Sequence, residues 1–276
     1  MPVRERQLAA YAERHATTTP LNTSPRYLAG PGDARHVTHA LAEAGWTSPS
    51  DPLDPQIRMI SPDRRLSLWY DPQTSTSAWW RLRGTSPESG YWYAAFGEMV
   101  PAEILAGFTD ALIALPPKDA PPGVWEQLAG TGWTCSHHDD GTGQAVSPDD
   151  LLLVTQRHCA DGSRAVWRVD AFDGPHGRGL LWDAWLEDTA PAPAVAAFVT
   201  ALIDPGPVLR GKFDRTGAYV TQESSPFVPE QVVEAHVARL KSIRSKARAA
   251  RRRTLATTPA PTPAVPARSP DSARAR

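Results

Sequence analysis

Apolar and polar positions follow two different periods along the chain, and each period marks a type of element. Apolar residues recur at helical spacing between residues 33 and 45. Short alternating or β-branched runs follow at 57–60, 66–70, 78–83 and 91–96. Helical spacing returns over 101–112, where Pro101 suits a first helical position. The pattern predicts a helix, an antiparallel meander of four strands with a possible extra strand after Trp46, and a second helix.

This succession of elements occurs twice, at an offset of 86 to 90 residues. Four anchors recur in the same order, pairing Trp46 with Trp133, Ile60 with Val146, Trp80 with Trp167 and Trp92 with Trp182. A fixed offset indicates a duplicated unit, here of roughly 85 residues. The sequence therefore predicts an α+β fold of two tandem modules, each an antiparallel meander sheet flanked by an N-terminal and a C-terminal helix.

The rest of the chain divides around these modules. The predicted boundaries are an N-terminal segment at 1–26, a first repeat at 27–116, a second repeat at 121–206, a connector at 207–228, a basic amphipathic helix at 229–255 and a tail at 256–276. The tail is rich in proline and alanine and too poor in large apolar side chains to bury a core. It is therefore expected to be disordered.

A Ser-Pro-Asp sequence stands between two predicted strands in each copy, at Ser61–Asp63 and Ser147–Asp149. Proline sets φ for the second residue of a turn, and serine and aspartate accept local backbone hydrogen bonds. Both sequences therefore predict hairpin turns. A catalytic role for Asp63 or Asp149 has no partner residue to support it.

These turns and their flanking sequences resemble an actinobacterial family of unknown function, named SPDY after its Ser-Pro-Asp-Tyr motif. The flanking sequences are SPRYLAGPGDARHVTHALAEAGW from Ser24, SAWWRLRG from Ser77 and FGEMVPAEILAGFTDAL from Phe96. Arg64 and Asp150 stand where the family has its tyrosine. The resemblance covers two tandem copies and implies a Streptomyces-like host and a cytoplasmic protein. It carries no established activity and no catalytic residue.

Charge is unevenly distributed, although the formal net charge is only -1. Residues 1–235 hold 18 of the 29 lysines and arginines and 29 of the 30 acidic residues, whereas residues 236–276 hold the other 11 bases beside Asp271. An acidic body and a basic C-terminal segment are therefore expected. The longest apolar runs are far too short for a membrane span, and the charged N-terminus does not resemble a signal peptide, so we expect a cytoplasmic location.

Strand alternation predicts an aromatic sheet face in the first module. Asp183 lies between Trp182 and Ala184, which marks the even-numbered positions of that run as the core side. Transferred to the first copy, this alternation exposes a possible binding face of Trp69, Trp79, Arg81, Arg83, Tyr91 and Tyr93. Most of these aromatics are missing from the second copy. Such a face suits packing against the other module or a protein partner, which we expect, or stacking of nucleic-acid bases.

Metal-binding residue types gather at Cys135, His137, His158 and Cys159. Their spacing matches no regular zinc motif, and a polar loop explains them more simply. The sequence therefore predicts no metal site and no other cofactor. In a reducing compartment these two cysteines, the only ones in the chain, are expected to remain thiols.

The predicted helix at 229–255 combines an apolar stripe with many cations. The stripe consists of Val233, Val237, Leu240, Ile243 and Ala247. The cations are Arg239, Lys241, Arg244, Lys246, Arg248, Arg251, Arg252 and Arg253. The helix can dock on the acidic body, bind the phosphates of a nucleic acid or lie on a membrane surface, although it lacks an aromatic anchor for the last role.

No motif of nucleophilic, metal-dependent or nucleotide-dependent catalysis occurs in the chain. We therefore predict a non-enzymatic interaction or scaffold protein that binds a protein partner through its sheet faces or its basic helix. Two alternatives stay open. One is a nucleic-acid-associated protein that uses the arginine-rich helix, and the other is an unrecognised hydrolase with its site between the modules.

Overall fold

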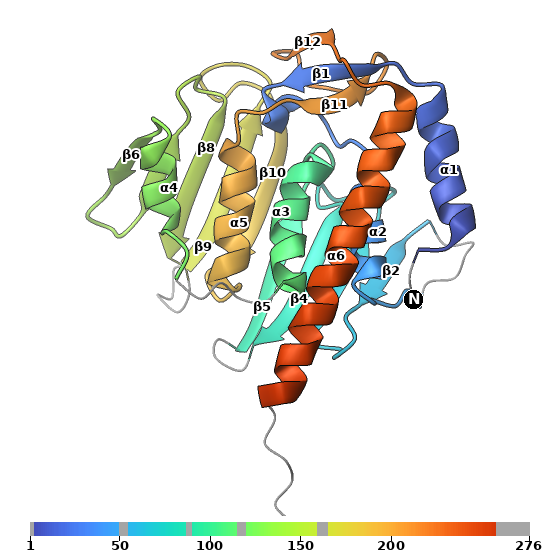
Figure 1. Cartoon of the computed structure of the whole chain (residues 1–276). Coiled ribbons are helices and arrows are strands. Elements are labelled where there is room, and N and C mark those ends of the chain that lie inside the picture. Colours follow the sequence, from blue (N-terminus) through green and yellow to red (C-terminus); the bar gives the residue numbers. More distant parts are fainter. Residues whose placement is uncertain (1–2, 50–54, 87–89, 115–119, 159–164, 258–276) are drawn as a thin grey trace, which may run out of the picture.

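Each predicted module is present as a helix, a meander and a second helix (Figure 1). The computed structural model describes residues 3–49, 55–86, 90–114, 120–158 and 165–257. The first module consists of α2 (Arg35–Glu43), β2 (Ile57–Ile60), β3 (Leu66–Tyr70), β4 (Trp80–Ser86), β5 (Gly90–Phe96) and α3 (Ala102–Ile113). The second consists of α4 (Val124–Gly130), β6 (Thr134–His137), β7 (Gly143–Val146), β8 (Leu152–His158), β9 (Ala165–Phe172), β10 (Leu180–Glu187) and α5 (Ala192–Ile203). The α+β prediction is confirmed.

The strands of both modules form a single nine-stranded antiparallel sheet in the order β2-β3-β4-β5-β10-β9-β8-β7-β6. Each module contributes one meander, and the meanders join where β5 pairs with β10, with Ala184 opposite Phe96 and Leu186 opposite Ala94. The modules therefore meet edge to edge. Each meander covers an edge of the other that would otherwise expose unpaired backbone groups.

Corresponding residues of the two copies occupy corresponding places, as the duplication predicts. Trp80 lies opposite Phe96 in the first module, and Trp167 lies opposite Leu186 in the second. The extra strand is complete in the second module, where it is β6, and is reduced to one residue bridge in the first. The two copies therefore share one pairing register.

The Ser-Pro-Asp sequences form the predicted hairpin turns. The Ser147 hydroxyl donates to Asp149 Oδ1 at 2.6 Å and accepts from the backbone N–H of Leu152 at 2.9 Å. The first copy repeats both contacts at the same distances. The next residue, Arg64 or Asp150, has a φ of 60°, a left-handed conformation that costs a residue with a side chain about 1–2 kcal/mol. Both aspartates of the motif serve the turn itself.

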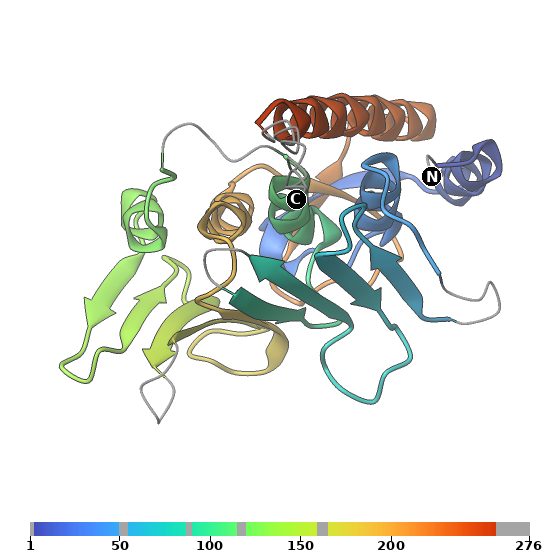
Figure 2. The ribbon, with the colours of Figure 1, turned by 90° about the horizontal axis from the view of Figure 1, so that it is seen from below.

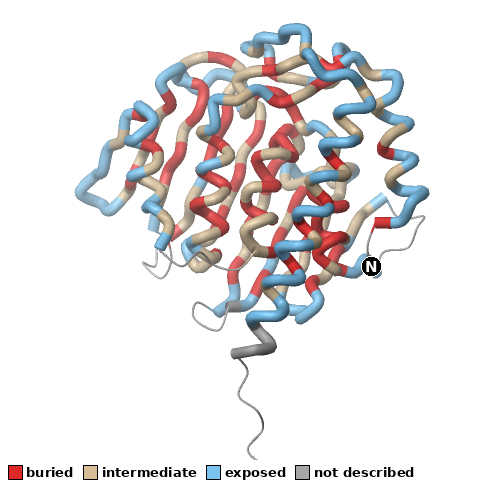
Figure 3. Tube along the Cα trace, viewed as in Figure 1, coloured by how far each residue is buried: buried red, intermediate tan, exposed pale blue. Residues whose placement is uncertain are grey.

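Helices α2, α3, α4 and α5 cover one face of the nine-stranded sheet, and none of the described helices covers the other (Figure 2). The core lies between the two layers, where buried positions recur along the strands and the facing helices (Figure 3). The Phe96 ring of β5 contacts Phe108 of α3 at 5.7 Å and Phe198 of α5 at 5.4 Å. Burial of each such side chain contributes about 1.5–3 kcal/mol, so this contact ties the modules into one core.

A second sheet joins the two regions named above as the N-terminal segment and the connector. In this three-stranded sheet, β1 (Pro20–Ser24) lies between β11 (Val208–Gly211) and β12 (Thr221–Ser224). Helix α1 (Glu5–Ala16) precedes β1, and the short 3-10 helix η1 (Arg26–Leu28) follows it. Segments from opposite ends of the duplicated region thus form one structural unit.

The basic helix is α6 (Pro229–Thr257), which packs across α1, α2 and α3 on the helical side of the molecule (Figures 1 and 2). Leu240, Ile243 and Ala247 of its predicted stripe are buried there. Ala256 and Thr257, assigned to the tail in the sequence analysis, belong to the helix. The remainder of the tail, 258–276, lies outside the described residues.

Candidate functional site

The uncovered face of the nine-stranded sheet carries a row of alternating arginine and aromatic side chains. Arg58 of β2 lies 5.0 Å from the centre of the Trp69 ring of β3. Arg83 of β4 lies 5.2 Å from the same ring and 5.7 Å from the Tyr93 ring of β5. Tyr93 contacts Trp185 of β10 at 5.6 Å between centroids. This arginine–aromatic row crosses five adjacent strands and both modules.

Strand alternation explains why the row lies on this face. Trp80 and Leu82 of β4 are buried beneath the helices, so Arg81 and Arg83 point to the opposite side. Arg81 pairs with Asp71 at 3.4 Å, whereas Arg83 forms no ion pair with a described residue. Each exposed cation–π contact is worth about 0.5–1 kcal/mol. This energy is enough to orient the guanidinium group but too small to prevent it from binding a partner.

Five of the six residues predicted for a binding face lie on this side. Trp69, Arg83 and Tyr93 belong to the row, Arg81 lies beside it, and Tyr91 is 47% exposed at the start of β5. The structure therefore brings these five together on one open surface.

Trp79 does not share that surface. It precedes β4, which begins at Trp80, so the alternation of the strand does not extend to it. Its ring meets Tyr70 edge-on at 6.3 Å, and the Tyr70 ring packs on buried Trp80 at 4.1 Å. Trp79 therefore packs at the margin of the core.

Two members of the row, Arg58 and Trp185, were absent from the prediction. Trp185 belongs to the second module and reaches Tyr93 only because β5 pairs with β10. The same edge pairing leaves the face outside the junction between modules, so packing between the modules does not cover it. The alternation of β10 did contain a signal for Trp185, because odd-numbered residues of this strand lie on the face opposite to the buried Trp182.

The second-module half of the face differs in charge pairing and in aromatic content. Arg168 donates to Asp170 at 2.8 Å and lies 3.9 Å from Asp183, so its charge is compensated. Thr155, the counterpart of Trp69, is buried. The first module, by contrast, supplies the row with Arg83, which forms no ion pair with a described residue.

Three of the eight predicted cations of α6 hold this helix on the body. Arg239 binds both oxygens of Asp110 at 2.7 and 2.8 Å, and Arg244 donates to Glu43 at 2.6 Å. Arg251 donates to a backbone carbonyl at the end of α2. The other five, Lys241, Lys246, Arg248, Arg252 and Arg253, have exposed side chains.

The two modules differ at the surface where α6 docks. The positions of Glu43 and Asp110 are occupied by Gly130 and Thr200 in the second copy. That copy therefore offers no carboxylate at these two places to Arg244 and Arg239. This difference explains why the helix lies over the first module.

The residues considered for a metal site lie on the outer strands of the second module. Cys135 and His137 belong to β6, His158 ends β8, and Cys159 lies outside the described residues. The His137 ring packs against Trp125 at 5.0 Å. Within the described part of the chain, no group of three or more His, Cys, Asp or Glu side chains is placed to hold a metal ion.

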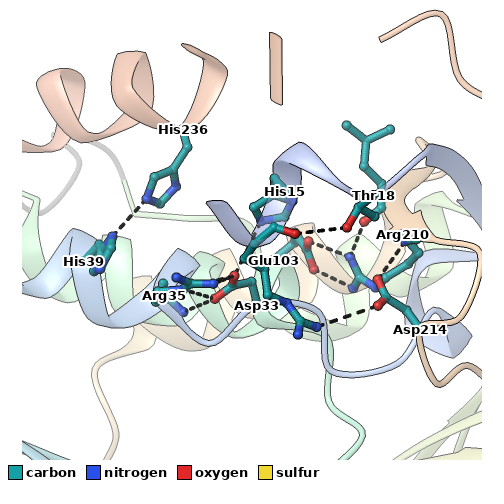
Figure 4. Close-up of polar contacts among 12 residues, drawn as sticks. His15, Thr18, Asp33, Arg35, His39, Glu103, Arg210, Asp214 and His236 are labelled. Atoms are coloured by element: carbon teal, nitrogen blue, oxygen red, sulfur yellow. Dashed lines mark hydrogen bonds and ion pairs between the residues drawn. The ribbon is translucent and has the colours of Figure 1, made fainter. Parts of the chain in front are cut away.

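A cavity of about 370 Å³ lies where α1, β11 and α6 meet the first module, beside the polar contacts that Figure 4 draws. Arg210 and Glu103 form a buried ion pair in its wall, with two contacts of 2.8 Å. The other three N–H groups of Arg210 donate to the carbonyls of Ala29, Gly30 and Leu209. Burial alone would raise the pKa of Glu103, but Arg210 outweighs it and lowers that pKa to about 2. The guanidinium group of Arg210 thus has all five N–H groups bonded, and the ion pair joins the three-stranded sheet to α3.

Histidines gather on one side of this cavity. His39 Nδ1 of α2 lies 3.2 Å from His236 Nε2 of α6 (Figure 4). The Tyr11 ring stacks on His236 at 4.0 Å between centroids. Burial, together with Arg35, lowers the pKa of His39 to about 4. Burial and neighbouring cationic or histidine groups lower the pKa of His236 to about 3. Both rings are therefore neutral at pH 7.

A second pocket, of about 300 Å³, lies at the junction of the modules between α3, α4 and α5. Its lining is formed by alanines and prolines, with Gln127 and Thr200 as its polar members, and includes no titratable side chain. The hydrolase alternative placed its site between the modules. The titratable groups instead converge in the cavity beside α1 and α6.

Comparison with known proteins yields one family match. The family model described as SPDY, a domain of unknown function (DUF317), matches residues 60–118 and 146–208. Each match begins just before a Ser-Pro-Asp turn and extends past the helix that follows the meander. No significant match was found among curated proteins or among solved structures. None of the described helices has the length and apolar character needed to cross a bilayer.

Proposed function

Because this chain carries two tandem copies of the SPDY domain, a domain of unknown function, we propose its role from its own geometry. The chain is a non-enzymatic interaction protein that binds a protein partner through the uncovered sheet face. The observation that carries this proposal is the arginine–aromatic row on that face. Tryptophan, tyrosine and arginine are the residue types that dominate binding energy at protein interfaces.

Charge on the first-module half of the face favours an acidic partner. Arg81 pairs there with Asp71, whereas Arg83 forms no ion pair with a described residue. Carboxylates of a partner would gain charge-assisted hydrogen bonds from guanidinium groups that the aromatic rings already orient. Complementary charge of this kind also accelerates association.

The geometry of the rings supports a protein over a single-stranded nucleic acid. A base needs an open ring face on which to stack. Arg58 and Arg83 both lie over the Trp69 ring, and Arg83 also lies over Tyr93. The surface therefore suits hydrogen-bond acceptors, such as carboxylates, that bind the N–H groups at the edges of the guanidinium planes.

Nucleic-acid binding through α6 is a second candidate, and a separate observation favours it. Lys241, Arg248 and Arg252 are exposed at spacings of seven and four residues, which places them along one side of the helix. Helix α6 itself lies on the helical side of the molecule, away from the open sheet face (Figure 2). Binding here would weaken steeply as salt rises, with a slope that decreases when Arg248 and Arg252 are replaced.

Photocrosslinking in the cell tests the proposal. Tyr91 is exposed beside the row, so a benzophenone amino acid at this position would lie within reach of a bound partner. The same probe at exposed Ser242 on α6 is the matched control for the opposite side. We expect a protease-sensitive adduct from position 91, none of the same mass from position 242, and loss of the adduct in Arg83→Glu. Reversal of one hot-spot charge typically weakens binding at least about tenfold.

Three outcomes would contradict the protein-partner proposal. These are a nuclease-sensitive adduct at position 91, equal adducts at positions 91 and 242, and an adduct that Arg83→Glu leaves unchanged. A nuclease-sensitive adduct at position 242 alone would favour the second candidate.

We further propose that binding takes place in the cytoplasm of a Streptomyces-like host. Cys135 on the edge strand β6 is a free thiol, and a reducing compartment would keep it so. The crosslinking experiment is therefore designed for such a host, with cytoplasmic and secreted fractions analysed separately. Recovery of the chain only from the secreted fraction would contradict this location.

A further inference from the structure

The cavity between α1, β11 and α6 contains a buried polar atom that the fold does not satisfy. His236 is 4% exposed, lines the cavity, and has no hydrogen-bond partner for its Nδ1 among the described residues. Its other ring nitrogen faces His39 Nδ1 at 3.2 Å. Buried polar atoms in native proteins almost always have a partner, so an unpaired one beside a cavity indicates a missing group.

The tautomers of the histidine pair define what that group must do. When His39 donates to His236, Nδ1 of His236 carries the proton and acts as a donor. When His236 donates instead, Nδ1 is an acceptor. A hydroxyl or amide group satisfies either arrangement, because each can both donate and accept.

The charged side chains around the cavity are already compensated. Each has a partner of opposite charge, in the pairs Asp33–Arg35, Glu103–Arg210, Asp214–Arg14, Asp204–Arg26 and Asp110–Arg239. A charged ligand would lose its hydration here without gaining a free counter-charge. The walls therefore favour a molecule without net charge.

The remaining lining is apolar. Aliphatic surface comes from Pro207, Val208 of β11, and Val232 and Ala235 of α6. Tyr11 contributes an aromatic ring. A volume of about 370 Å³ lies at the small end of the range for ligand pockets. We propose that this cavity binds a small uncharged molecule with an apolar body and one hydroxyl or amide group, which pairs with His236 Nδ1. The site is independent of the open sheet face, from which the helical layer and the sheet separate it.

Three isosteric probes test the charge selectivity of the site. Benzamide is uncharged and carries an amide, benzoate is its anionic counterpart, and benzamidine is its cationic counterpart. Binding to the full chain at pH 7 is measured by ligand-observed NMR titration, with histidine ring resonances followed in parallel. We expect benzamide to bind with a dissociation constant on the order of 1 mM, as suits so few atoms, and to shift the His236 resonances. The charged probes are expected to bind at least about tenfold more weakly.

Substitutions locate the binding event. His236→Phe keeps a ring on Tyr11 but removes both ring nitrogens, including Nδ1, and we expect about tenfold weaker benzamide binding. Val232→Trp fills the cavity from α6 and is expected to abolish binding. Ala238→Trp, at an exposed position of the same helix, is the matched control and retains binding. Circular dichroism and thermal unfolding verify that each variant is folded.

Several results would overturn the proposal. Benzoate or benzamidine binding as tightly as benzamide would show that the site is not selective for uncharged molecules. No binding of any probe at about 20 mM, well above the expected dissociation constant, would show that the cavity holds water only. Full affinity for benzamide in Val232→Trp would place the binding event elsewhere.

Discussion

We expect the protein to lose stability between pH 7 and pH 5 because of the histidine pair between α2 and α6. His39 and His236 are 5% and 4% exposed, and their ordinary pKa is 6.5. Burial lowers the pKa of His39 to about 4 and that of His236 to about 3 in the folded chain. Between these values and 6.5 the unfolded chain binds more protons than the folded one, so acidification favours unfolding. The stabilisation is complete above pH 6.5 and declines as the pH falls toward 4.

The magnitude at pH 5 does not depend on how far each pKa is lowered, provided that it stays below 5. Over the interval from pH 6.5 to pH 5, protonation of each histidine stabilises the unfolded chain relative to the folded one by about 1.36 kcal/mol per pH unit. This amounts to about 2 kcal/mol per histidine and about 4 kcal/mol for the pair. His36, whose pKa burial also lowers to about 4, changes stability in the same direction. A domain with about 5–15 kcal/mol of total stability would lose a large part of it.

Urea unfolding at pH 7, 6 and 5, followed by tryptophan fluorescence, measures this loss. The double variant His39→Phe/His236→Phe removes the titrating pair while keeping two rings, and it should lose about 4 kcal/mol less than the parent between pH 7 and 5. His138→Gln, at an exposed position of the second module, is the control and should behave as the parent. An equal loss in the parent and the double variant would refute the reasoning.

Other substitutions test the contacts that position the site. Glu103→Gln leaves the buried guanidinium of Arg210 without a counter-charge, so we expect the free energy of unfolding to fall by about 3–5 kcal/mol in urea titrations. A loss under about 1 kcal/mol would contradict the role of this pair. Ser147→Ala leaves the backbone N–H of Leu152 without its acceptor and should cost about 1–2 kcal/mol by the same measurement, whereas a neutral effect would mean that the hydroxyl is dispensable to the turn. Arg64→Gly relieves the left-handed conformation and should stabilise by about 0.5–1 kcal/mol, visible as a higher Tm, and a lower Tm would contradict this account.

The candidate interface was predictable where it depends on the alternation of single strands. Arg81, Arg83 and Tyr93 follow from period two within β4 and β5, because a meander strand shows its two faces in its own sequence. The same rule failed for Trp79, which lies one residue outside its strand. Trp185 needed more than alternation, since its place beside Tyr93 depends on the pairing of strands from different modules.

The role of the basic helix was also only partly visible in the sequence. Its apolar stripe and its cations were evident from helical spacing. The choice between a docked helix and a free one depended on carboxylates elsewhere in the chain, at Glu43 and Asp110. Their absence from the second copy shows that two diverged modules can share a fold and differ in what they bind.

The sequence by itself determined the duplication, the order of elements in each module and the Ser-Pro-Asp turns, because all of these depend on local spacing that occurs twice. Only the tertiary structure decided that the modules share one sheet, that β1 pairs with β11, and that Arg210 meets Glu103 beside a cavity. Such contacts join residues far apart in the chain. Each depends on complementary shape and charge, which produce no periodic pattern of residues in the sequence. The two candidate sites arise at these long-range contacts, which is why the sequence outlined the fold more completely than it outlined the sites.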